Sequence, residues 1–126
     1  MSARTVLFAQ LLVLFALACL HIFGLIHFLY WQYRWLDIIA HLLGGVWIGF
    51  NVLWIGAVRS KTSPVLFCAA AGLGIGMLWE VFEAYFGITS FPIDAFDTTK
   101  DLVMDMLGSA AVGFFNSSIP RVKQKR

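Results

Sequence analysis

The sequence predicts an all-α, polytopic membrane protein in which four transmembrane helices form a bundle. Hydrophobic residues make up 60% of the 126 residues and charged residues only 13%, which is too apolar for a soluble domain of this size. Four apolar stretches are each long enough to cross a bilayer as a helix, which takes roughly 20 residues. They cover about 6–30, 38–58, 65–88 and 102–119. The connections between them are short, so residues 1–126 are expected to form a single integral membrane domain.

The distribution of positive charge predicts the orientation in the membrane. With four spans, both termini and the connection between the second and third spans lie on one side. That side carries Arg4, Arg59, Lys61, Arg121, Lys123, Lys125 and Arg126. The other side carries only Arg34 and Lys100. The positive-inside rule therefore places both termini in the cytoplasm and the protein in the inner (cytoplasmic) membrane. The basic tail 120–126 is expected to contact anionic lipid headgroups, and no nucleic-acid partner is predicted.

The first stretch, 6–30, carries His21 and His27 and leads into the aromatic cluster 30–35. Clusters of this kind lie at headgroup level, so this one marks the outer end of the first helix. We expect both histidines to bond to neighbouring backbone or hydroxyl groups. Whether His27 joins a functional site is left open by the sequence.

The second stretch, 38–58, follows Asp37 and contains His41. Residues four apart share a helix face, so the two side chains are expected to lie together, with Gly44 or Gly45 continuing the face inward. Two interpretations stay open. The pair could belong to a metal site, directly or through a hydrogen bond, or Asp37 could simply cap the helix beside an incidental histidine.

The third stretch, 65–88, places glycines and acids on one stripe. Gly72, Gly76, Glu80 and Glu83 follow each other at spacings of four, four and three. Glycine lets helix backbones approach closely in a membrane, so this face is predicted to point at other helices rather than at lipid. The glycine-rich faces of the second and third helices could also pair two copies of the chain, so a homo-oligomer is an open alternative.

The fourth stretch begins with an acidic stripe. Asp97, Asp101, Asp105 and Gly108 share one helix face and lead into an apolar run. Carboxylates at the mouth of an apolar helix are costly to bury without partners. Asp94 is expected to belong to the preceding loop, and the sequence does not decide whether Asp97 belongs to the site or to that loop.

When the depth of each acid is counted along its helix from the outer end, the acids are predicted to lie in one layer near the outer face. All seven Asp and Glu residues fall at or near that face, where only Arg34 and Lys100 are available as counter-charges. A divalent cation would supply the missing charge, and one histidine with several carboxylates suits Mn, Fe, Zn or Mg. Two alternatives stay open, namely a proton or cation pathway and a structural network of protonated carboxyls.

The spacing of these residues resembles a known family. The motifs are Asp37-xxx-His41-xx-Gly44, Glu80-xx-Glu83 and Asp97-xxx-Asp101-xxx-Asp105-xx-Gly108. In this order they resemble the YjdF-like group of small inner-membrane proteins of unknown function, which are similar to the VanZ-like superfamily. In VanZ-like proteins, Gln and Asn stand where this chain has Glu83 and Asp105. The resemblance implies a membrane fold but no substrate, and the two extra acids favour metal binding.

These observations lead to a predicted function. We expect a metal-bound carboxylate cavity near the outer face that hydrolyses a lipid or polyprenyl phosphate. The predicted metal ligands are His41, Glu80, Glu83, Asp101 and Asp105. The predicted catalytic residues are Asp37, which orients His41 or acts as a general base, and Glu83; Arg34 and Lys100 are predicted phosphate contacts. The alternatives are a proton or cation transporter and a structural or assembly subunit without catalysis.

Overall fold

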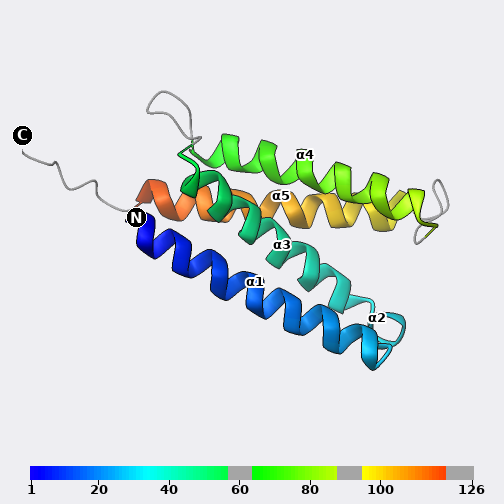
Figure 1. The fold of residues 1–126 in the computed structure, drawn as a ribbon. Helices are drawn as coiled ribbons and strands as arrows, with labels where there is room; N and C mark the ends of the chain where they lie inside the picture. Colours follow the sequence, from blue (N-terminus) through cyan, green and yellow to red (C-terminus); the bar gives the residue numbers. More distant parts are fainter. Residues whose placement is uncertain (57–63, 88–94, 119–126) are drawn as a thin grey trace, which may run out of the picture.

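The computed structural model describes residues 1–56, 64–87 and 95–118, and every regular element in these ranges is helical. The described residues form four long helices and one short one (Figure 1). Their bounds are α1 Ala3–Ile26, α2 Leu29–Gln32, α3 Trp35–Trp54, α4 Pro64–Tyr85 and α5 Ala95–Ser118. Asp94 and the basic tail lie outside the described residues.

The first predicted stretch is divided between two helices. α1 begins after Ser2, whose side-chain oxygen accepts a hydrogen bond from the Thr5 N–H at 3.1 Å, as an N-cap residue does. It ends at Ile26, because Phe28 has a left-handed backbone with φ of 55°, which an α-helix cannot contain. The aromatic residues that follow form the separate short helix α2.

Three of the described helices are long and apolar enough to cross a membrane, namely Arg4–Ile26, Trp35–Trp54 and Pro64–Tyr85. α5 is as long as α1, but its first two turns carry Asp97, Lys100 and Asp101. Large apolar side chains are exposed along α1 and α4, including Phe8 and Phe15 on α1 and Leu66 and Leu78 on α4. Exposed apolar surface of this extent is what a lipid-facing protein presents.

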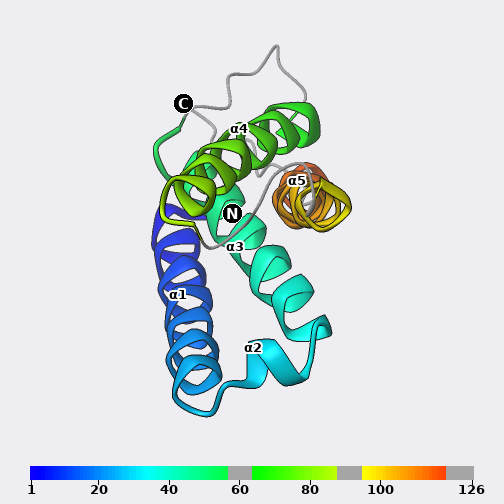
Figure 2. The same cartoon turned by 90° about the vertical axis from the view of Figure 1, so that its right-hand side faces the viewer.

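α3 lies at the centre of the arrangement. It packs against α1, α4 and α5, and α4 and α5 also pack closely on each other. Figures 1 and 2 show α1 beside α3, and in Figure 2 α5 lies on the far side of α3 from α1 while α4 crosses above α3 and over the end of α1. Within the described ranges, α1 packs on α3 and α2 and not on α4 or α5. The fold is therefore a closely packed three-helix core with α1 attached to one face.

Glycines set the close approach of α5 to its neighbours. A Cβ atom added at Gly45 of α3 would overlap the backbone of Asp105, and one added at Gly72 of α4 would lie 2.6 Å from the Asp105 carbonyl oxygen. On the α5 side, a Cβ atom at Gly108 would overlap the Leu42 carbonyl. These glycine faces are occupied by α5 of the same chain, so they give no reason to expect a homo-oligomer.

We expect Gly45→Ala to destabilise the protein by about 1–3 kcal/mol, the usual cost of forcing extra atoms into a packed core. The matched control is Gly74→Ala on α4, because a Cβ atom there meets nothing within 4 Å. Thermal unfolding in detergent should show a lower midpoint for Gly45→Ala and an unchanged or slightly higher one for the control, since alanine favours helix. Equal midpoints for the two variants would contradict the close packing of Gly45 against α5.

Candidate functional site

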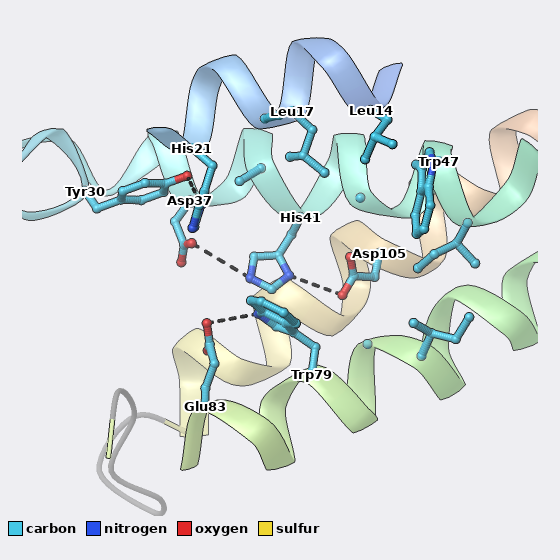
Figure 3. A pocket seen from close by; sticks show the side chains of 16 residues that line it. Leu14, Leu17, His21, Tyr30, Asp37, His41, Trp47, Trp79, Glu83 and Asp105 are labelled. Carbon is cyan, nitrogen blue, oxygen red and sulfur yellow. Dashed lines mark hydrogen bonds and ion pairs between the residues drawn. The ribbon is translucent and has the colours of Figure 1, made fainter. Parts of the chain in front are cut away.

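His41 lies at the centre of a group of acidic side chains (Figure 3). Its imidazole is buried on α3. One ring nitrogen, Nδ1, lies 3.2 Å from Oδ2 of Asp105 on α5, and the other, Nε2, lies 3.8 Å from Oδ1 of Asp37. The predicted contact between Asp37 and His41 is confirmed, and His41 also links α3 to α5.

The glycines of α3 and α4 make room for the Asp105 carboxylate. A Cβ atom at Gly76 would lie 2.6 Å from its Oδ2, and one at Gly44 would lie 3.6 Å from its Oδ1. A larger side chain at Gly76 would therefore displace the carboxylate from His41. The predicted stripe of glycines and acids on α4 thus has a local purpose, since it lets α5 present a buried acid to the histidine.

Asp37, His41 and Asp101 each offer a ligand atom, and these atoms all lie within 4.8 Å of one another. Ligand atoms on one ion of bond length ~2.1 Å lie no more than about 4.2 Å apart, so only a slight closing would be needed. Asp101 is 4% exposed and its Oδ1 has no hydrogen-bond partner among the described residues. Buried oxygens without a partner are rare, and they mark a place where an ion or a water is expected.

Glu80 and Glu83 do not belong to this group of three. Glu80 is buried on α4, and its Oε1 also lacks a hydrogen-bond partner among the described residues. Glu83 is half-buried one turn further along and accepts a hydrogen bond from Nε1 of Trp79 at 2.9 Å. Sequence reasoning missed Trp79, although its spacing of four from Glu83 could have indicated the contact.

Arg34 and Lys100 both contact Asp97. Lys100 donates a hydrogen bond to Oδ1 of Asp97, and Nη2 of Arg34 lies 3.6 Å from the same oxygen. Asp97 lies in the first turn of α5, ahead of the predicted span, and the hydrogen bond from Lys100 together with the charges of Lys100 and Arg34 lowers its pKa below the usual value. Both predicted phosphate contacts are therefore held at Asp97.

A cavity of about 370 Å³ lies beside His41, between α1, α3 and α4. One end is polar, and its ionisable and hydroxyl-bearing lining residues are His21, Tyr30, Asp37, His41, Glu83 and Asp105. The other end is lined by Leu14, Leu17, Ala18, Trp47, Ile48 and Ile75. Nδ1 of His21 and the Tyr30 hydroxyl lie 3.0 Å apart, which confirms the expected hydroxyl partner for His21. His27 does not line this cavity and packs its ring on Phe23 instead.

Comparison with known proteins places the chain in a family. A family model described as a predicted membrane protein (DUF2238) matches residues 4–120. The chain belongs to this family. The YjdF-like resemblance is consistent with DUF2238, whereas a relation to the VanZ-like superfamily is not shown. No curated protein and no solved structure matches the chain. The matched range includes His41 and every acid around it.

The charges around His41 in this DUF2238 protein are unbalanced. Among the described residues, the only Lys or Arg side chains in an ion pair with an acid are Arg34 and Lys100, and both pair with Asp97. Asp37 and Asp105 have His41 as their ion-pair partner, and Asp101 has no such partner in the part of the chain that the structure describes. Such a group can exist with protonated carboxyls or with a bound cation.

We expect Lys100→Met to lower the free energy of unfolding at pH values above the ordinary Asp pKa of about 3.9, and to have little effect at lower pH. The pKa of Asp97 is lowered in the folded state, so its contribution is present above that value and is lost as the pH falls through the folded pKa. The contribution should be under about 1 kcal/mol, because the pair is partly exposed. Thermal midpoints of the two proteins at about pH 6 and about pH 2 measure this difference, with Lys100→Arg as the charge-preserving control. An equal loss at both pH values would contradict the ion pair.

Proposed function

We propose that this DUF2238 protein is a metal-dependent hydrolase of lipid phosphates, with Asp37, His41 and Asp101 as the metal ligands. The observation that supports it most is the buried Asp101 oxygen without a partner, beside Asp37 and His41, with the three ligand atoms within 4.8 Å of one another. Two carboxylates and an imidazole form a ligand set that binds Zn, Mn or Fe well and leaves positions for water and substrate.

In this proposal Asp105 positions His41 rather than binding the ion. Its carboxylate lies 3.2 Å from Nδ1 of His41, which leaves Nε2 facing Asp37 for coordination. A carboxylate on the second nitrogen fixes the tautomer and the orientation of a ligand histidine. Compared with the sequence-based assignment, Asp37 and Asp105 exchange roles. Glu80 and Glu83 are no longer among the ligands, and Glu83 keeps only its catalytic role.

The proposed reaction is hydrolysis of a phosphate monoester. A metal lowers the pKa of a bound water toward neutrality and offsets the negative field of the carboxylates, which would otherwise repel a phosphate. With the metal bound, Glu83, which lines the same cavity as His41, would accept a proton from the water while the water oxygen forms a bond to phosphorus. The bond from phosphorus to the lipid oxygen breaks, and that oxygen takes up the proton. The products are a lipid alcohol and inorganic phosphate.

We also propose that α5 is a fourth span and that both termini are cytoplasmic, in the inner membrane. The basic residues of the sequence support this orientation, and α5 packs along α3 and α4, both of which are apolar enough to cross the bilayer. His41 and the acids then lie toward the outer face. Arg34 and Lys100 would contact a phosphate only if their ion pairs with Asp97 were broken first.

The proposed metal site is tested by elemental analysis of protein in detergent, after loading with Zn, Mn, Fe or Mg. We expect near-stoichiometric metal in the parent and its loss in His41→Gln and Asp101→Asn. Asp105→Asn should weaken binding roughly 10–100-fold, as is usual for a carboxylate that orients a ligand histidine. Asp97→Asn is the matched control, because Asp97 lies one turn before Asp101 on α5; this variant should retain the metal. Metal-free parent protein, or equal loss in the control, would rule out this site.

Catalysis is tested by phosphate release from a lipid phosphate monoester in mixed micelles. The metal-loaded parent should release phosphate and stop when the metal is chelated. Glu83→Gln should keep its metal but lose roughly 10²–10⁴-fold in rate, the usual contribution of a general base. If metal-loaded parent protein releases no phosphate, the hydrolase proposal fails even though the metal site stands.

A further inference from the structure

The cavity beside His41 is polar at one end and apolar at the other, so it matches an amphiphilic ligand. Its polar end contains His41, Asp37 and Glu83, and its apolar end is formed by Leu14 and Leu17 of α1 with residues of α3 and α4. Figure 3 shows Leu14 and Leu17 on one side of His41 and Trp79 with Glu83 on the other. A purely polar substrate would leave the apolar end unfilled, and a hydrocarbon alone would leave the acids unpaired.

The dimensions of the cavity fit one hydrocarbon chain. Along α3 the lining runs from Asp37 to Ile48, which is about 16 Å at ~1.5 Å per residue. The part from His41 to Ile48, about 10 Å, is left for the chain, and it takes the portion nearest the headgroup, because the chains of one leaflet fill roughly half of the ~30 Å hydrocarbon core. The volume of about 370 Å³ lies near the lower end of the roughly 300–1,000 Å³ found for small-molecule sites. One chain fits such a space better than two.

The cavity is not fully enclosed, and the gap between α1 and α4 is the side on which we expect its opening. These two helices form opposite walls, yet they do not pack on each other within the described ranges. Lining side chains on both walls are accessible, with Leu14 of α1 39% exposed and Ile75 of α4 47% exposed. In a membrane, such an opening faces lipid, so a chain can enter without leaving the bilayer.

We propose that this cavity binds the single hydrocarbon chain of the lipid phosphate, which enters sideways between α1 and α4 and places its headgroup at His41. The inference rests on the proposed function for the headgroup, and on the cavity alone for the chain. It assigns α1, which holds none of the proposed metal ligands, to recognition of the substrate chain.

The test uses a single-chain lipid phosphate with a photoreactive group at mid-chain, added to the full-length protein in detergent. Labelling should map to the α1 segment from Leu14 to Ala18 and to α4 near Ile75. Ala18→Phe narrows the cavity and should lower labelling at least tenfold. Ala16→Phe is the matched control, because Ala16 is exposed on the same helix and does not line the cavity. Equal labelling of the two variants, or labelling elsewhere, would overturn the proposal.

Two competitors separate this inference from the proposed function. A two-chain lipid phosphate should compete at least tenfold less well than its single-chain counterpart, and equal competition would overturn the single-chain assignment. A single-chain alcohol tests the headgroup instead: it should compete weakly against metal-loaded protein. If it competes as well as the phosphate while Ala18→Phe still blocks labelling, the hydrolase proposal fails and the chain-binding cavity stands. Metal content, measured in the same Ala18→Phe sample, should equal that of the parent.

Discussion

The close contact of α5 with the glycines of α3 and α4 is the constraint on which the rest of the structure depends. The Asp105 backbone packs directly against Gly45 and Gly72, and its side chain is directed past Gly76 to His41. With any larger residue at these positions, the helices would separate and Asp105 would no longer reach the imidazole. The same contact brings Asp101, one turn earlier on α5, to Asp37 and His41 on α3. The contacts that pack α5 on α3 and α4 are thus the same contacts that bring the acids to His41.

The acids around His41 show how a low-dielectric environment concentrates electrostatic energy. Buried carboxylates without counter-charges destabilise a fold unless they are protonated or bind a cation. Arg34 and Lys100 do not relieve the group, because both are engaged by Asp97 at its edge. The part of the chain that the structure describes therefore keeps an uncompensated site next to a cavity. Such an arrangement is costly for stability and is a common mark of function.

Several features of the fold and site could be predicted from the sequence because they depend on local spacing. Apolar runs of membrane length predicted the helices, and a spacing of four predicted the contact between Asp37 and His41. The break after Ile26 could not be predicted, because the left-handed residue is a phenylalanine, and the nearest glycine, Gly24, lies within the helix. The contact of Asp105 with the other nitrogen of His41 could not be predicted, because it depends on how α5 crosses α3. The packing of α1 on α3 and α2, and not on α4 or α5 in the described ranges, could not be predicted from the sequence pattern, and neither could the cavity.

The attachment of α1 separates two tasks within a very small protein. α1 supplies one wall of the cavity but packs on neither α4 nor α5 in the described ranges, so its inner face can change without disturbing the contacts that assemble His41, Asp101 and Asp105. Related chains could therefore acquire different ligand preferences by altering a single helix. Modularity of this kind usually requires separate domains, and here it arises because one helix of a bundle is in contact with only part of it.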